Sequence, residues 1–263
     1  MSERDATGNG PPPIQLERLR YVVSGKAVLD GVDLAVGRGE IVGIMGRSGT
    51  GKTTLLRVVM GLVRPTSGRV LINGRDLGEL GEAELDGVRV GMGMVFQGAA
   101  LFDSMTVAEN VAFGLVEHRR MELREAAGRV GELLEMVDMA GTEGLMPAEL
   151  SGGMRKRVGV ARALALEPAI MLYDEPTAGL DPISAAAVDD LVLRLCQQFG
   201  VSTLIVSHDV QSLRRVADRA ALLHEGAFLA VGPMAELGAS GNAAVRQFLA
   251  GEPKGPLTSE TTG

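Results

Sequence analysis

The sequence predicts an α/β fold built on a largely parallel β-sheet with helices on both faces. Short apolar runs of strand length recur along the chain, separated by turn signals and by stretches with helical spacing. The runs are continuously apolar, which is typical of strands buried on both faces, as in a parallel sheet covered by helices. They span residues 41–45, 70–72, 92–96, 169–173, 203–207 and 220–224.

Composition and charge limit the class of protein. Of the 263 residues, 46% are hydrophobic and 22% are charged, ordinary values for a folded globular protein. The formal net charge of −7 gives the surface no overall attraction for nucleic acid or anionic lipid. No apolar stretch is long enough for a membrane span, and the start lacks the pattern of a secretory signal. We therefore expect a cytoplasmic protein that reaches a membrane only through a protein partner.

The two ends of the chain differ from its middle. Residues 1–13 are polar and Gly-rich and end in three prolines, so we predict a disordered N-terminal arm. One domain is expected over residues 14–240, with a helical subdomain at about residues 98–165. Residues 241–263 form a C-terminal extension that we predict to be largely flexible, and unstructured from about Gly251, where Gly and Pro are again frequent.

Two helices can be placed from residue patterns. Within residues 119–139, apolar residues recur at spacings of three and four, as on one face of a helix inserted between sheet segments. They are Leu123, Ala126, Ala127, Val130, Leu133, Leu134 and Val137. A second helix should begin near Pro182, since Asp181 can cap it and proline is favoured at the first helical position. Cys196 lies in an amphipathic helical pattern, so we expect a small buried side chain and not a catalytic thiol.

A glycine-rich loop follows the apolar run 41–45 and precedes the helical pattern 54–60. Its residues are Gly46, Arg47, Ser48, Gly49, Thr50, Gly51, Lys52 and Thr53. This spacing and this context are those of a phosphate-binding P-loop. Glycines let successive backbone N–H groups point at phosphate oxygens, and the following helix adds its positive end. We expect the loop and Thr54 to bind ATP, with Lys52 on the terminal phosphates and the Thr53 hydroxyl on Mg²⁺.

Two carboxylates end the apolar run 170–173. Asp174 and Glu175 are consecutive residues at the end of a predicted strand. Consecutive side chains of a strand point to opposite faces, so the two carboxylates can have different roles. Asp174 should hold Mg²⁺ through its water shell, and Glu175 should polarise the attacking water. By themselves two acids after a strand are as often a solvated turn, but the P-loop in the same chain favours the catalytic interpretation.

Of the three histidines, only His208 is a candidate for chemistry. His208 directly follows the apolar run 203–207 and could lie at the same sheet edge, near the γ-phosphate; alone it would more often be a surface histidine. His118 and His224 have no such context, and we interpret them as structural or solvent-exposed.

Residues 150–154, Leu-Ser-Gly-Gly-Met, followed by three basic residues, resemble the signature sequence of the ABC ATPase family. P-loop, signature, acidic strand and His208 also follow the family's order, and the resemblance covers residues 14 to about 235. It implies a P-loop NTPase fold: a RecA-like core, an antiparallel β segment and a helical subdomain. It also implies a head-to-tail dimer with two ATP molecules at the interface. Ser151, Gly152 and Gly153 would then contact the γ-phosphate held by the partner's P-loop, besides capping the helix that follows.

The same resemblance assigns further roles. Gln97 matches the glutamine that touches Mg²⁺ or the attacking water and couples to the membrane subunit. Asp181, in Gly-Leu-Asp, matches the aspartate that spans the dimer interface. Glu175 and His208 match the catalytic base and the switch histidine, which implies ATP hydrolysis.

Two positions depart from the family pattern. Met154 stands where many members have glutamine, so a polar contact is lost or replaced there. The aromatic residue that usually stacks on adenine has no clean match: its position falls near Val23, while Tyr21 lies two residues earlier on what could be the same strand face. Whether Tyr21 stacks on the base or only packs is open.

The variant signature Ser-Gly-Gly-Met-Arg-Lys-Arg, residues 98–107 and residues 245–249 look like the subfamily that serves Mce/Mla-type lipid transport. In such systems the ATPase pairs with a permease resembling MlaE and an Mce-domain substrate-binding protein, and it moves phospholipids or other hydrophobic molecules. A small regulatory subunit is a further candidate partner. This resemblance implies a location at the cytoplasmic face of the inner membrane and no nucleic-acid partner.

Two alternatives stay open at this stage. A soluble ABC ATPase of DNA repair or translation tends to carry long coiled-coil insertions or two cassettes, which this sequence lacks, and an acidic surface does not suit a nucleic-acid clamp. An ABC transporter of another class, for amino acids or drugs, would share every motif above. Co-purifying partners would separate these possibilities.

Overall fold

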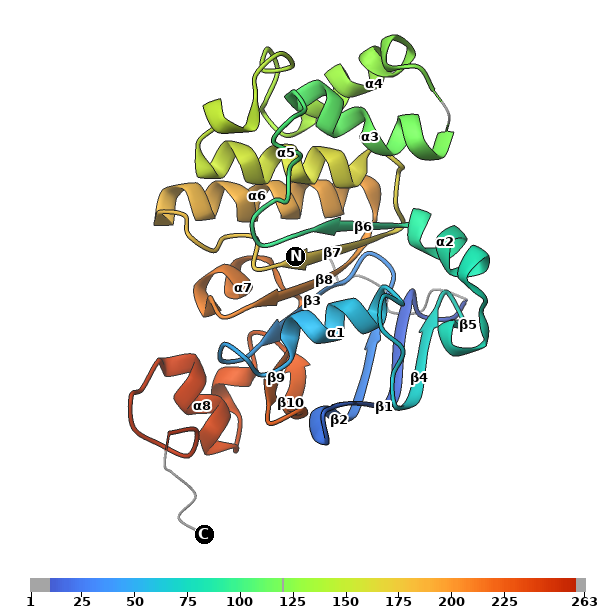
Figure 1. Ribbon diagram of the computed structural model, residues 1–263. Helices are drawn as coiled ribbons and strands as arrows, with labels where there is room; N and C mark the ends of the chain where they lie inside the picture. The colour runs from blue at the N-terminus through green and yellow to red at the C-terminus, as the bar shows by residue number, and fades with distance from the viewer. Residues whose placement is uncertain (1–9, 120, 259–263) are drawn as a thin grey trace. The chain divides into compact units, whose positions relative to one another are not determined.

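The computed structural model describes residues 10–119 and 121–258 (Figure 1). Most of the predicted N-terminal arm, residues 1–9, and the last part of the C-terminal extension, residues 259–263, lie outside the described residues. The chain forms two compact units: one holds the residues up to Glu79 and those from Leu204 onward, and the other holds Leu80–Thr203. The predicted domain boundaries at residues 14 and 240 stay predictions.

The first unit contains an antiparallel sheet. Its strands are β1 (Ile14–Val23), β2 (Lys26–Val36), β4 (Ser67–Ile72) and β5 (Arg75–Asp76), in the order β2-β1-β4-β5. Ser24 and Gly25 join β1 to β2 in a two-residue turn with φ of 49° and 79°, the positive values that a tight hairpin requires. The short helix η1 (Leu77–Glu79) follows β5. This sheet confirms the antiparallel β segment.

Parallel strands make up the other part of the first unit. Strand β3 (Ile41–Met45) is buried throughout and pairs in parallel with β9 (Arg219–His224), which pairs antiparallel with β10 (Ala227–Pro233). Strand β8 (Ser202–Ser207), in which the chain passes from the second unit to the first, is also fully buried. Helices α1 (Lys52–Val59), α7 (Val210–Val216), η3 (Leu237–Ala239) and α8 (Ala243–Ala250) complete the unit.

The second unit combines two parallel strands with a helical layer. Strand β6 (Met92–Val95) pairs with β7 (Ile170–Asp174). The helices are α2 (Glu82–Val90), α3 (Val107–Arg119), α4 (Leu123–Met136), η2 (Pro147–Glu149), α5 (Gly152–Leu164) and α6 (Pro182–Phe199). Helix α5 packs against α3, α4, α6 and β6, as Figure 1 shows for this unit. Parallel strands with helices in both units confirm the predicted α/β class.

The two helices placed from sequence are present. The pattern over residues 119–139 is α4, and its apolar face is buried at Ala126, Val130 and Leu134. Helix α6 begins at Pro182. The Asp181 carboxylate accepts hydrogen bonds from the backbone N–H groups of Ile183 and Ser184, both at 3.0 Å. Cys196 is buried, as expected. Among the described residues, no helix combines the length and the hydropathy that a membrane span requires.

Candidate nucleotide-binding and hydrolysis site

The P-loop connects β3 to α1 in the first unit. A Cβ atom at Gly46 would lie 2.6 Å from the Leu223 carbonyl oxygen, and one at Gly51 would lie 2.8 Å from the Val28 carbonyl oxygen. Gly51 also has a φ of 102° at the N-cap of α1. Only glycine fits such close backbone approaches, so the loop can curve back tightly before the helix starts. No acidic residue lies in the first turn of α1, which leaves its positive end available to an anion.

Lys52 is held inside this loop. Its side chain is 6% exposed, and Nζ donates hydrogen bonds to the carbonyl oxygens of Gly46 at 2.7 Å and Arg47 at 3.1 Å. Thr53 follows on the exposed side of α1, and Thr54 is half-buried. The positive charge therefore lies against the start of the loop, where the backbone N–H groups of a P-loop collect phosphate oxygens.

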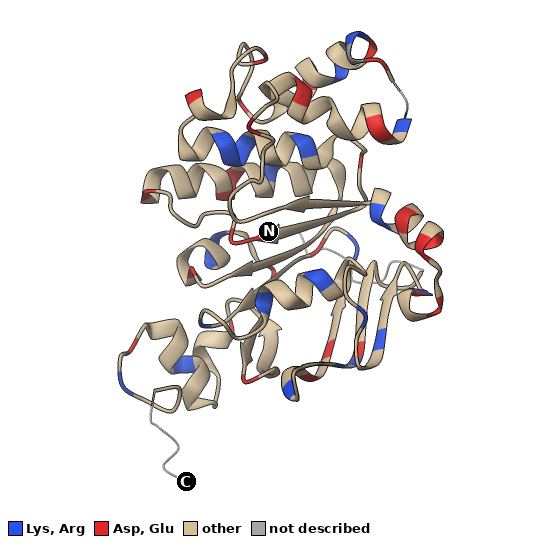
Figure 2. Cartoon of the chain, viewed as in Figure 1, with Lys and Arg blue, Asp and Glu red and all other residues tan. Residues whose placement is uncertain are grey.

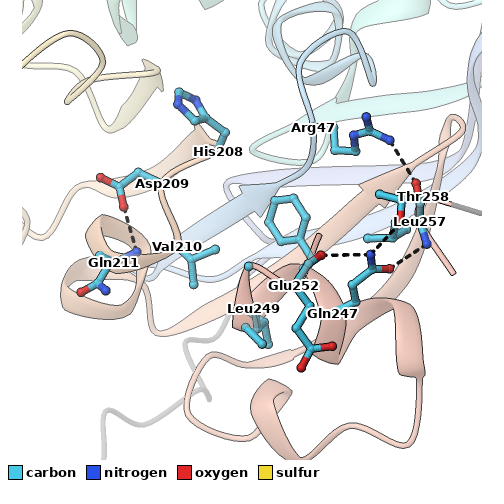
Figure 3. A pocket seen from close by; sticks show the side chains of 13 residues that line it. Arg47, His208, Asp209, Val210, Gln211, Gln247, Leu249, Glu252, Leu257 and Thr258 are labelled. Atoms are coloured by element: carbon cyan, nitrogen blue, oxygen red, sulfur yellow. Dashed lines mark hydrogen bonds between the residues drawn. The ribbon is translucent and has the colours of Figure 1, made fainter. Parts of the chain in front are cut away.

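Arg47 and His208 lie in one pocket of about 620 Å³ (Figure 3). His208 is an exposed residue between β8 and α7, and the neighbouring Asp209 caps α7 by accepting hydrogen bonds from the N–H groups of Gln211 and Ser212, at 2.8 and 3.1 Å. The structure thus brings the predicted switch histidine close to the P-loop within the first unit. His118 is exposed and His224 is half-buried beside Glu225, as their lack of context suggested.

Residues of the C-terminal segment, 247–258, line the other side of this pocket, which no sequence pattern predicted. Arg47 Nη1 donates to the carbonyl oxygen of Leu257 at 3.0 Å. Gln247 on α8 is 4% exposed; its amide donates to the Glu252 carbonyl and the Thr258 hydroxyl and accepts from the Leu257 N–H (Figure 3). The prediction of an unstructured chain from about Gly251 needs correction for residues 251–258. They form no helix or strand, but one buried amide binds them at three points.

Replacing that amide should release the segment. In Gln247→Leu the buried Leu257 N–H loses the partner given by this side chain, which costs about 1–3 kcal/mol, while the Glu252 carbonyl and the Thr258 hydroxyl each lose one hydrogen bond. We expect amide hydrogen exchange across residues 251–258 to rise at least tenfold, while α6 in the other unit exchanges as before. Gln198→Leu, at an exposed position, is the matched control. Unchanged exchange in Gln247→Leu would mean that other contacts hold the segment.

In the second unit, Asp174 and Glu175 lie at the end of β7. Both are buried, with 5% and 8% exposed. Glu175 has a φ of 49°, in the left-handed region that residues other than glycine seldom adopt. Such conformations persist where the surrounding structure fixes them, and they gather at functional sites. Gln97 lies just beyond β6, the strand beside β7, and is exposed.

Lys156 is the residue of this site that sequence reasoning missed. It is 5% exposed on α5, and its Nζ donates to the carbonyl oxygen of Gln97 and, at 3.1 Å, to that of Glu175. Burial lowers the pKa of Lys156, and the negative charges of Asp174 and Glu175 oppose that shift. The only signal in the sequence was the basic run that follows the signature.

The signature residues begin α5. Ser151 is the exposed N-cap, and its hydroxyl accepts from the Met154 N–H at 3.3 Å, so the expected capping role is present. A Cβ atom at Gly152 would lie 3.3 Å from the Leu180 side chain, so the start of α5 lies beside the Gly-Leu-Asp segment. Hydrogen bonds from Ser184 lower the pKa of the exposed Asp181 carboxyl. The second unit thus brings the signature and Asp181 segments together.

Tyr21 lies on β1, half-buried, opposite Leu29 of β2. The side chain of Leu29 would lie 3.4 Å from a Cβ atom at Gly51, so this hairpin runs beside the P-loop. Val23 is 46% exposed near the hairpin turn. Stacking of Tyr21 on adenine stays a prediction.

Comparison with known proteins identifies the family. The sequence model of a family described as "ABC transporter" matches residues 29–178, more than half of the chain. The intermembrane phospholipid transport system ATP-binding protein MlaF of Haemophilus influenzae is 39% identical over 244 residues, which are 93% of this chain and 92% of that protein. The chloroplastic protein TRIGALACTOSYLDIACYLGLYCEROL 3 of Arabidopsis thaliana is 41% identical over 88% of this chain and 72% of its own length. The methionine import ATP-binding protein MetN of Mesorhizobium japonicum is 40% identical over 88% of this chain and 63% of its own length.

Solved structures agree. A dimeric ATP-binding cassette in a post-hydrolysis state, bound to ADP and Pi, superimposes with a TM-score of 0.76 at 32% identity, covering 84% of this chain and 98% of that chain. A component of an ABC transporter complex from Clostridium perfringens superimposes with a TM-score of 0.81 at 30% identity, covering 88% and 92%. These matches confirm the P-loop NTPase fold of ABC ATPase type. The chain belongs to the ABC transporter family and is the ATP-binding, ATP-hydrolysing subunit of an ABC transporter.

Proposed function

We propose that this chain powers a transporter of phospholipids or other hydrophobic molecules, working on a separate membrane permease at the cytoplasmic face of the inner membrane. The observation that carries the proposal is the similarity to MlaF, which extends over 93% of this chain and 92% of that protein. The variant signature from Ser151 to Arg157 supports the same subfamily. Methionine import proteins match at a similar identity, so an amino-acid transporter is the second candidate.

For the nucleotide, we assign the triphosphate to residues 46–54. The uncrowded N-terminus of α1 and the buried ammonium group of Lys52 support this assignment. We propose Thr53, Asp174 and Gln97 as the residues that would hold Mg²⁺. Mg²⁺ usually keeps several waters and is bound through one or two carboxylates and the substrate phosphates, so a set of residues with the single carboxylate of Asp174 fits it. When bound, the ion neutralises charge that develops on the phosphates.

For hydrolysis, we assign the general base to Glu175 and the γ-phosphate contact to His208. Glu175 is 8% exposed directly after β7 and its backbone has a φ of 49°, so the side chain starts from a fixed position, which suits a general base. The exposed position of His208, in the same pocket as Arg47, suits a contact with the terminal phosphate.

For assembly, we propose a head-to-tail dimer in which Ser151, Gly152 and Gly153 complete the partner's site and Asp181 crosses the interface. The similar cassette bound to ADP and Pi is dimeric. Ser151 and Asp181 are exposed, and the adjacent Ile183 is an apolar side chain with 83% exposed, which suits a surface covered by another chain.

The permease would dock beside Gln97. Phe96 and Phe102 flank it with 41% and 40% of their side chains exposed. Phe102 packs on Phe113 with ring centroids 4.7 Å apart and lies 5.7 Å from the Arg162 guanidinium, which keeps its ring in place. We extend the proposal to an MlaE-like permease, an Mce-domain protein and a small regulatory subunit in one complex.

Purification from native membranes tests the cargo and the partners. Tagged Glu175→Gln protein, extracted in mild detergent, should carry with it a MlaE-like permease, an Mce-domain protein and phospholipid, identified by mass spectrometry. A permease of the methionine-import type would place the chain in the second class. Recovery without any permease, or with ribosomes or DNA, would contradict the transporter assignment.

A further inference from the structure

Lys156 joins the ends of two neighbouring strands. Its Nζ donates to the main-chain carbonyl oxygens of Gln97, just beyond β6, and of Glu175, just beyond β7. The two strands pair in parallel up to Val95 and Tyr173. A lysine that is 5% exposed is uncommon, because burying an ammonium group is costly unless it is paired. Here the ammonium group is bound to the backbone of the two residues assigned to the attacking water.

The face of α5 that carries Lys156 also contacts the loop after β6, at Ala99 and Ala100. Lys156, Gly159 and Arg162 follow at spacings of three and so share one face of the helix. A Cβ atom at Gly159 would lie 3.2 Å from the Ala99 side chain, so α5 approaches the loop closely. Arg162 donates to the carbonyl oxygens of Ala99 at 2.6 Å and Ala100 at 2.7 Å. Lysine and arginine are concentrated along α5 in Figure 2.

The loop after β6 and the end of β7 both contain residues in a backbone conformation that hydrogen bonds from α5 can stabilise. Ala99 and Ala100 have φ values of 61° and 46°, and Glu175 has 49°, all in the left-handed region that costs a non-glycine residue about 1–3 kcal/mol. Without donors from α5, the carbonyl groups of these segments would have to turn towards other partners. The side chains of Gln97 and Glu175 would then lose their fixed separation.

We propose that Lys156 is a positioning residue for ATP hydrolysis, which holds the main chain of Gln97 and Glu175 together so that both side chains meet the attacking water in one geometry. The inference rests on the proposed roles of Gln97 and Glu175. Lys156 acts through these two residues and does not bind the nucleotide itself, so its removal affects turnover and leaves the P-loop unchanged.

The test compares Lys156→Met with Arg157→Met. Methionine keeps most of the length of the lysine side chain and removes its charge and its donors. Arg157, the next residue on the helix, instead binds Asp138 and the Val137 carbonyl on another face, so its replacement is the matched control. We expect kcat of Lys156→Met to fall roughly 10²-fold, the scale of a displaced catalytic group, with the KM for ATP and the thermal midpoint near those of Arg157→Met. Lys156→Arg, which keeps charge and donors, should recover part of the loss.

A double-mutant cycle separates positioning from general damage. If Lys156 acts through Glu175, Lys156→Met should lower kcat much less in a Glu175→Gln background than in the wild type. An equal loss in both backgrounds, or normal kcat in Lys156→Met, would overturn the inference alone. Normal turnover by Glu175→Gln would instead overturn the assigned role of Glu175, and the inference with it. If Lys156→Met does not fold, Lys156→Gln replaces it in the same cycle, with the same outcomes deciding.

Discussion

Glu175→Gln should slow ATP hydrolysis by roughly 10²-fold or more while ATP binding stays intact. Glutamine preserves the shape of the side chain but cannot accept the proton of the attacking water. A 10²-fold loss corresponds to about 2.7 kcal/mol of activation free energy. Binding should persist because the assigned phosphate contacts come from the P-loop and Lys52, between β3 and α1, and Glu175 is not one of them. Steady-state phosphate release and equilibrium binding of ATP measure the two properties separately.

The control for this variant is Glu135→Gln, which removes the same charge from an exposed position on α4 in the same unit. It should hydrolyse ATP at the wild-type rate. If Glu175→Gln also retained near-normal turnover, the carboxylate would have no catalytic role. If it lost ATP binding instead, Glu175 would be needed for the folded site and its kinetics would say nothing about the chemistry.

Ser151→Arg should abolish turnover while a single protomer still binds ATP. Ser151 is an exposed N-cap at the start of α5, and in the proposed dimer it contacts the γ-phosphate bound by the partner. An arginine there would fill the space for that phosphate and separate the two chains. Losing the cap alone costs only about 1 kcal/mol of stability, so the protein should stay folded. Phosphate release, ATP binding and the thermal midpoint would be measured on the same preparation.

Two further variants serve as controls for Ser151→Arg. Ser151→Ala removes the hydroxyl without adding bulk and should retain part of the activity. Gln198→Arg adds the same bulk and charge at an exposed position near the end of α6 and should behave as wild type. Wild-type turnover by Ser151→Arg would refute a site shared between two protomers, whatever the oligomeric state.

Elements with local signals could be predicted from the amino-acid sequence alone. The P-loop is read from eight consecutive residues, because its function depends on backbone that only glycine allows beside a lysine and a threonine. The start of α6 follows from Asp181 and Pro182, and the fully buried strands β3 and β8 follow from runs that are largely apolar. By contrast β1 and β2 contain charged residues and are only partly buried, so no apolar run marked them, and the antiparallel sheet was expected only from the family resemblance.

Contacts between distant parts of the chain could not be predicted from the amino-acid sequence and are seen only in the folded structure. Lys156 binds the carbonyl of a residue 59 positions away, and Arg47 binds one 210 positions away. Both acceptors are main-chain oxygens, which every residue carries, so the sequence of the acceptor holds no sign of the pairing. The left-handed backbone of Glu175 was equally invisible, because no glycine marks it. The local role of a side chain, such as capping a helix, can be predicted from neighbouring residues. The distant main-chain group to which it donates a hydrogen bond depends on how the strands and helices fold around it.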